Sequence, residues 1–296
     1  MNQILKKIRI LGRTFIGYIL KWEIDFNGTR GLSPLIFNGT SDDLIVSLTS
    51  YGRRVNKTVY YTLISLLRQT IRPAKIILWL SEEEWSPQTI PNKVNRLSKF
   101  GVEIRYCKDL KSYKKFIPTC RLYPENIIVT VDDDMIYCRN MIDSLISSHK
   151  INPKAICCNI ASKVEINEDG SLKPYRLWKE PVFDGEHPIL MPWGCWGILY
   201  PPHSLYKDVI NENLFFKLCP QADDVWFWGM SELNSTPKLL GNLKGQVAGY
   251  SFDDLYQYFH KGAALTHVND HENRNQEQLD CLVDYYKLKF NKYLEK

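Results

Sequence analysis

The sequence predicts an open α/β sheet in which most strands run parallel, with helices on both faces. Apolar runs of strand length recur in the first half of the chain, at residues 44–49, 75–80, 102–106 and 126–131. Segments with helical spacing separate these runs, and this alternation implies parallel strands joined by right-handed crossovers. The fourth run leads directly into Asp132, Asp133 and Asp134, at the edge where open α/β sheets bind their ligands.

Composition and charge are those of an ordinary globular protein. The 296 residues are 44% hydrophobic and 24% charged, which is enough for a sizeable core. The formal net charge of +5 is concentrated in residues 1–22, and the near balance elsewhere predicts no nucleic-acid partner. The eight cysteines lack the spacing of a zinc site, so we expect reduced thiols and a cytoplasmic protein.

Residues 1–42 are predicted to form a basic amphipathic helix, to about residue 22, followed by a glycine-containing linker. The apolar residues at helical spacing are Ile4, Leu5, Ile8, Leu11, Phe15, Ile19 and Trp22. Charged residues interrupt them too often for a spanning helix, and no secretory cleavage site follows. Such a helix can lie on an anionic membrane surface, as in a peripheral membrane protein; the alternative is docking on the protein's own core.

The main domain is predicted over residues 43–296. Its first part, residues 43–160, alternates the four strands with helices and continues into a fifth strand near residues 155–159. Its second part, residues 161–268, is less regular and contains an aromatic loop that leads into an apolar run. Residues 269–296 are predicted to be a C-terminal helix with a clear apolar stripe that includes Phe290 and Tyr293.

The three aspartates predict a divalent-metal site. Strand alternation would put Asp132 and Asp134 on one side and Asp133 on the other. Two like charges on one side repel each other unless a cation joins them. Mg²⁺ or Mn²⁺ takes one or two carboxylates and completes its shell with phosphate oxygens. The alternative is a solvated acidic turn.

Together these motifs resemble GT-A glycosyltransferases, in particular family-2-like bacterial enzymes of lipopolysaccharide or capsule synthesis. The resemblance covers residues 44–230 and rests on the order of the first strand, the D-x-D element Asp132–Asp134 and the acidic pair Asp223–Asp224. It implies a GT-A fold, a nucleotide-sugar donor, a Mn²⁺ or Mg²⁺ cofactor, a donor half at 43–160 and an acceptor half at 161–268. The sequence departs from the pattern where Asp-Asp replaces Glu-Asp, and where residues 81–84 lack an aspartate that usually contacts the base.

The resemblance also assigns roles to single residues on the donor side. Asp134 is the expected metal ligand, Asp132 binds the donor or shares the ion, and Asp133 supports its neighbours. His267 is a possible third metal ligand, with a structural histidine as the alternative. The full donor-binding set is Thr49, Tyr51, Arg53, Asp109, Lys115, Asp132 and Asp133. For Lys115, the alternative is a solvated basic face.

On the acceptor side, Asp224 is the expected general base, with Asp223 as the fallback. A carboxylate suits this role because the sugar hydroxyl becomes acidic only in the transition state, so position matters most. Either acid could instead cap the helix that follows. Trp193, Gly194 and Trp196 are the expected acceptor-binding residues, through aromatic faces and close backbone approach.

The sequence therefore predicts a metal-assisted, inverting transfer of a sugar from a nucleotide sugar to a glycan or lipid-linked acceptor. A sugar-phosphate nucleotidyltransferase is one alternative, although residues 49–54 contain one glycine where that chemistry uses a glycine-rich loop. A metal-binding interaction module is the other, although the triplet lacks the later glycine and glutamate of a calcium loop.

Overall fold

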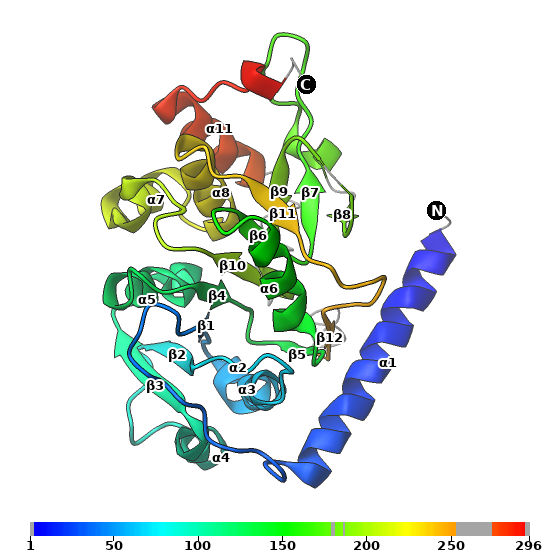
Figure 1. The fold of residues 1–296 in the computed structure, drawn as a ribbon, viewed down its shortest axis with the longest axis vertical. Coiled ribbons are helices and arrows are strands. Elements are labelled where there is room, and N and C mark those ends of the chain that lie inside the picture. The colour runs from blue at the N-terminus through cyan, green and yellow to red at the C-terminus, as the bar shows by residue number, and fades with distance from the viewer. Residues whose placement is uncertain (1–2, 179–180, 186, 253–273, 294–296) are drawn as a thin grey trace.

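A seven-stranded sheet runs through the molecule in the order β11-β6-β10-β4-β1-β2-β3 (Figure 1). The computed structural model describes residues 3–178, 181–185, 187–252 and 274–293, with side chains from residue 12 onward. The strands are β1 (Ile45–Thr49), β2 (Lys75–Ser81), β3 (Val102–Cys107), β4 (Ile128–Thr130), β6 (Ile156–Cys158), β10 (Ile198–Tyr200) and β11 (Lys238–Leu240). β4, β1, β2 and β3 pair in parallel, so the predicted fold class is confirmed.

Helices cover both faces because the strand side chains alternate between two apolar clusters. Val46 and Leu48 of β1 belong to the cluster that contains α3 (Val59–Leu67) and α6 (Met141–Ile151). Ile128 and Tyr200 belong to the other cluster. The helices of that second cluster are α5 (Ile117–Leu122), α7 (Glu212–Leu218), α8 (Asp223–Leu233) and α11 (Arg274–Tyr286). Burial on both faces explains why these strands read as continuous apolar runs.

The second part of the main domain completes the same sheet. β10 is antiparallel to both β4 and β6, and β11 is parallel to β6. Since β10 runs opposite to β4, the loop before β10 lies at the edge where β4 ends. A separate three-stranded sheet consists of β7 (Ala161–Lys163), β8 (Pro181–Val182) and β9 (Leu190–Pro192).

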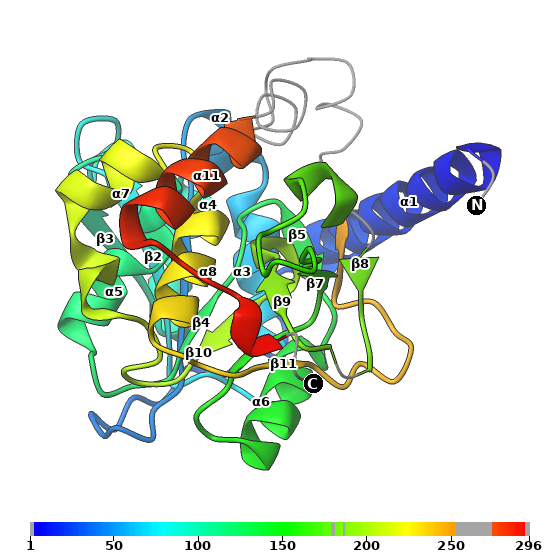
Figure 2. The same cartoon turned by 90° about the horizontal axis from the view of Figure 1, so that it is seen from above.

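α1 (Gln3–Asn27) lies beside a small antiparallel sheet of β5 (Met135–Tyr137) and β12 (Gly249–Ser251). Its N-terminal end projects beyond the body of the molecule in both views (Figures 1 and 2). Among the described helices, neither this one nor any other combines the length and apolar character needed to cross a membrane. All eight cysteines are free thiols, as expected.

Two predicted boundaries were wrong. The linker begins at Gly28 rather than residue 23, because α1 continues to Asn27, where Asn27 Nδ2 donates to Glu23 Oε1 at 2.7 Å. The C-terminal helix ends at Tyr286, because Lys287 adopts a left-handed φ of 51°. Phe290 and Tyr293 therefore lie beyond the helix. Residues 269–273 and 294–296 of the predicted helix lie outside the described residues.

The turn after β4 also differs from the sequence-based expectation. β4 ends at Thr130, and Asp133 and Asp134 lie in a turn rather than in a strand. The alternation of strand side chains therefore does not extend to the three aspartates. Their directions are set by partners from other elements, described next.

Candidate active site

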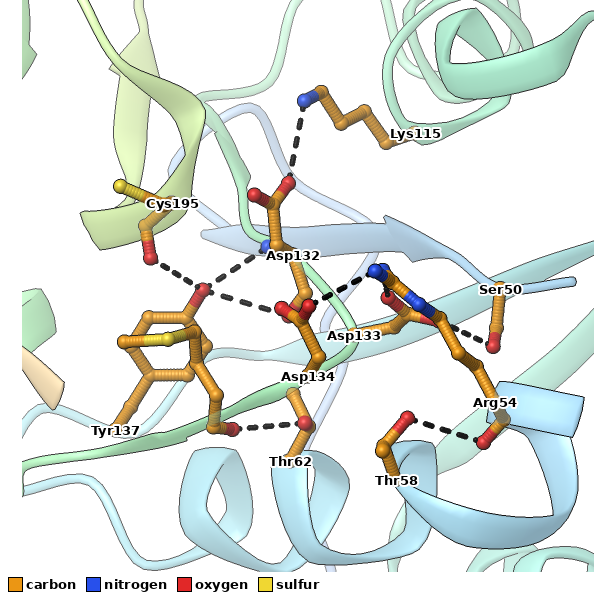
Figure 3. A network of polar contacts seen from close by, with 11 residues as sticks. Ser50, Arg54, Thr58, Thr62, Lys115, Asp132, Asp133, Asp134, Tyr137 and Cys195 are labelled. Atoms are coloured by element: carbon orange, nitrogen blue, oxygen red, sulfur yellow. Dashed lines mark hydrogen bonds and ion pairs between the residues drawn. The ribbon is translucent and has the colours of Figure 1, made fainter. Parts of the chain in front are cut away.

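The site is built where the parallel strands β1 and β4 end side by side. Ser47 of β1 lies opposite Thr130 of β4, so Ser50 and Asp133, each three residues further on, also come together. Ser50 Oγ donates a hydrogen bond to Asp133 Oδ2 at 2.5 Å (Figure 3). Asp133 is buried, with 3% of its surface exposed.

Arg54 joins two of the three aspartates. It lies in α2 (Arg53–Lys57), and its Nη1 atom is 2.8 Å from Asp133 Oδ1 while its Nη2 atom is 3.1 Å from Asp134 Oδ2. Burial lowers the pKa of Arg54, but the charges of Asp134 and Asp133 outweigh this and raise it, so the guanidinium is charged. Asp133 therefore has a fixed partner on both oxygens.

Lys115 joins the third aspartate to the acidic pair of α8. It ends the 3₁₀ helix η2 (Lys111–Lys115), and its Nζ atom lies 2.9 Å from Asp223 Oδ2, 3.3 Å from Asp132 Oδ1 and 3.9 Å from Asp224 Oδ1. Burial lowers the pKa of Lys115, but the three carboxylates raise it well above its usual value. One buried cation thus bridges residues from both predicted halves.

Asp224 is the carboxylate of this group that lies farthest from Lys115 Nζ. Gly194 N donates to its Oδ2 atom at 3.3 Å, while its Oδ1 atom receives no hydrogen bond from the described residues. Burial raises the pKa of Asp224 to about 7; Lys115 acts in the opposite direction, and Asp223 and Asp132 raise the pKa further. A carboxylate poised near neutral pH suits proton transfer.

The loop before β10 closes the site through its backbone. Gly194 begins the 3₁₀ helix η4 (Gly194–Trp196), and a Cβ atom there would lie 2.9 Å from Lys115 Nζ and 3.2 Å from Asp224 Oδ1. Tyr137 OH accepts from Asp132 N at 3.0 Å and donates to Cys195 O at 3.0 Å (Figure 3). Tyr137 therefore holds the aspartate turn against this loop.

The other predicted donor-binding residues are Asp109, Thr49, Tyr51 and Arg53, each with its own surroundings. Asp109 accepts hydrogen bonds from Lys111 N and Lys114 Nζ, and Thr49 Oγ1 donates to Trp79 O. Tyr51 is 43% exposed, with the Arg54 guanidinium 5.3 Å from its ring centre, and Arg53 is half-buried at the start of α2. His267 lies outside the described residues.

The two tryptophans of the predicted acceptor set differ in exposure. Trp193 is half-buried, and its Nε1 atom donates to Ser162 Oγ at 2.8 Å. Trp196 is buried, with its ring 5.2 Å from that of Phe183 and 5.8 Å from the Arg13 guanidinium of α1. Trp193 is therefore the more accessible aromatic face.

Sequence reasoning missed four residues that shape the site: Ser50, Arg54, Tyr137 and Gln278. Ser50 and Arg54 follow the first predicted strand within five residues. Their position at the carboxyl end of that strand is the sequence feature that could have identified them. Gln278 gave no such signal. It lies in α11, and its Oε1 atom accepts from Gln221 N at 2.8 Å and Ala222 N at 3.0 Å. It thereby caps the start of α8, where Ala222 has no side chain able to do so.

Asp134 and Asp132 could share a cation only together with oxygens of a ligand, since each already pairs with a protein cation: Asp134 with Arg54 and Asp132 with Lys115. Asp134 and Asp132 offer carboxylate oxygens, with 16% and 34% of their side chains exposed. No group of three His, Cys, Asp or Glu side chains suited to a metal occurs in the part of the chain that the structure describes. Mg²⁺ commonly takes one or two carboxylates and fills its shell with water and substrate phosphate, which agrees with this donor set.

A separate hollow lies along the edge strand β3. Its volume is about 630 Å³, and its lining includes Leu35, Phe37, Glu103 and Arg105. It contains none of the residues that gather around Lys115 and Arg54. The hollow beside β3 is thus separate from the cluster of residues around Lys115 and Arg54.

Comparison with known proteins finds similarity in solved structures alone. No protein-family model and no curated protein sequence matches the chain. S. aureus TarS in complex with UDP is 13% identical over 83% of this chain and 72% of that chain, with a TM-score of 0.44. A 4-diphosphocytidyl-2C-methyl-D-erythritol synthase is 11% identical over 73% of this chain and 96% of that chain, with a TM-score of 0.44.

A third similar structure is the mannosyltransferase PcManGT from Pyrobaculum calidifontis, in complex with GDP-Man and Mn²⁺. It is 12% identical over 52% of this chain and 45% of that chain, with a TM-score of 0.32. Sugar transfer and the synthesis of a cytidylyl compound thus both occur among these neighbours.

Proposed function

We propose that this protein is a glycosyltransferase that moves a sugar from a nucleoside diphosphate sugar to a hydroxyl group of a glycan or lipid-linked acceptor. One observation carries the proposal. Asp224, with a pKa raised to about 7 and an Oδ1 atom that receives no hydrogen bond from the described residues, shares Lys115 with the strand-end residue Asp132. A candidate base thus lies next to a candidate donor site.

The proposed reaction is a single displacement with inversion. The acceptor oxygen forms a bond to the anomeric carbon while the bond from that carbon to the diphosphate oxygen breaks. Asp224 takes the hydroxyl proton, and the electron pair leaves with the nucleoside diphosphate. Lys115 holds Asp224 and Asp132 in place. The Gly194 amide fixes the second Asp224 oxygen.

On the donor side, Asp134 and Asp132 would hold Mn²⁺ or Mg²⁺, and Asp133 with Arg54 would fix the turn that carries them. When bound, such an ion supplies Lewis-acid stabilisation of the diphosphate charge. The exposed Tyr51 and half-buried Trp193 supply faces for the donor base and acceptor sugar. Thr49, Arg53 and Asp109 remain donor-binding candidates.

The test is a thermal-shift screen of nucleotide sugars with and without Mn²⁺, followed by product analysis. We expect one nucleotide sugar to raise the melting temperature, because a ligand that binds the native state stabilises it by mass action. Asp134→Ala should remove the Mn²⁺-dependent part of the shift, and Asp143→Asn, an exposed change in α6, should not. Absence of any nucleotide-sugar binding would contradict the proposal.

Nucleotidyl transfer is the second candidate, because Arg53 and Arg54 follow β1 where a triphosphate would be held. The two candidates release different products. Sugar transfer releases a nucleoside diphosphate. In nucleotidyl transfer a sugar phosphate attacks a nucleoside triphosphate, which releases pyrophosphate. Pyrophosphate release from a nucleoside triphosphate and a sugar phosphate would favour nucleotidyl transfer over sugar transfer.

A further inference from the structure

The outer face of α1 carries an apolar stripe that is left exposed by the residues that the structure describes. Phe15, Ile19, Trp22 and Phe26 are 67%, 49%, 73% and 73% exposed. They are spaced four, three and four residues apart, so they share one side of the helix. In the sequence, the same spacing continues backward through Leu11, Ile8 and Ile4.

The opposite side of α1 attaches the helix to the body. Thr14 and Ile24 are buried there, and a Cβ atom on Gly17 would collide with the Ser251 carbonyl of β12. Arg68 Nη1 lies 2.7 Å from Glu23 Oε2, and Tyr61 OH donates to Asp25 Oδ1 at 2.7 Å. Because one side is fixed to the protein, the stripe points outward as a stable feature.

Charge indicates what the stripe contacts. Residues 1–22 contain five basic residues and no acid, whereas the rest of the chain contains equal numbers of basic and acidic residues. The first acids of the helix are occupied, since Glu23 pairs with Arg68 and Asp25 pairs with Lys21. A helix that combines an exposed apolar stripe with an excess of basic residues in the same segment is complementary to an anionic lipid surface, which attracts both features.

We propose that α1 docks the protein on an anionic membrane surface, with Phe15, Ile19, Trp22 and Phe26 entering the headgroup region. The projecting N-terminal end of α1 leaves room for such a surface (Figure 2). Arg13 lies against Trp196, in the loop that also contains Gly194, so the docked helix would hold the active-site loop near the lipid. The benefit for a lipid-linked acceptor rests on the proposed function, but the docking itself does not.

Vesicle co-sedimentation of the full chain, without any nucleotide sugar, tests the docking. We expect binding to phosphatidylcholine vesicles that contain phosphatidylglycerol, weaker binding to phosphatidylcholine alone, and a loss on adding salt. The double variant Trp22→Ser/Phe26→Ser should reduce binding by roughly tenfold or more, since the buried apolar area determines much of the affinity.

A matched control is Ile36→Ser/Ile151→Ser, which removes two apolar side chains that are 74% and 80% exposed elsewhere on the surface. It should bind vesicles like the wild type, and circular dichroism should show that both double variants fold. Absence of wild-type binding to anionic vesicles would overturn the proposal. So would a dimer in solution that Trp22→Ser/Phe26→Ser dissociates, if lipid binding were absent, because the stripe would then cover a second copy of the chain. Failure of sugar transfer alone would leave vesicle binding unchanged and would bear only on the proposed function.

Discussion

Asp133 and Asp224 are both carboxylates beside a buried cation, yet their surroundings differ: Asp133 is buried, whereas 35% of the Asp224 side chain is exposed. Asp133 accepts from Ser50 on one oxygen and pairs with Arg54 on the other. Asp224 shares Lys115 with two other acids and has one oxygen that receives no hydrogen bond from the described residues. Burial raises the pKa of both carboxyls, so the difference lies in their partners: Asp133 has both oxygens occupied and holds a turn, whereas Asp224 has an oxygen available to accept a proton.

The largest effect should follow from Asp224→Asn. If Asp224 is the base, kcat should fall by about 10²–10⁴-fold, the usual contribution of a general base, with a small change in KM. Initial-rate kinetics check this. Asp143→Asn serves as the surface control, and a variant Asp224→Asn with near-normal kcat would transfer the role to Asp223.

The pH dependence of the wild type and of Asp224→Asn provides a second test of the role of Asp224. Since Asp224 must be deprotonated, the wild-type rate should fall as the pH drops below about 7, the raised pKa of this group. The raised pKa also means that the folded state holds this proton more tightly than the unfolded state. The stabilising effect of Asp224→Asn should therefore grow from acidic pH up to about pH 7. Urea unfolding of both proteins across this range checks the sign; a pH-independent difference would contradict it.

Arg54→Met breaks the other half of the comparison. It leaves Asp133 buried without its ion pair, so the free energy of unfolding should fall by about 3 kcal/mol, as for other broken buried pairs. Urea unfolding at neutral pH measures this change. The double variant Arg54→Met/Asp133→Asn should recover much of the loss because it removes the uncompensated charge. A single variant as stable as the wild type would show that water solvates Asp133.

The smallest effect is expected from Gln278→Leu, which removes the cap from the segment that carries Asp223 and Asp224. We expect kcat to fall roughly tenfold with little change in donor KM, because small displacements of a catalytic group lower the rate. Gln278→Glu keeps an acceptor oxygen and should restore part of kcat. Equal losses in both variants would point to a general effect on folding.

The sequence alone determined the parallel strands, the placement of three aspartates after β4 and the acidic pair at the start of α8. These features follow from local patterns: apolar runs of strand length and the residues next to them. The exposed stripe of α1 was also visible in the helical spacing of its apolar residues. The spacing did not show whether that stripe faces the core or the solvent.

Only the tertiary structure decided which charges meet. Arg54 and Asp133 are 79 residues apart, and Ser50 and Asp133 are 83 apart, so no local pattern links them. Likewise, Gln278 reaches the start of α8 only because α11 packs against that helix. Partner choice depends on how distant elements pack, and that packing sets the burial and neighbouring charges that raise the pKa of Asp224 while Asp133 is held by Arg54 and Ser50.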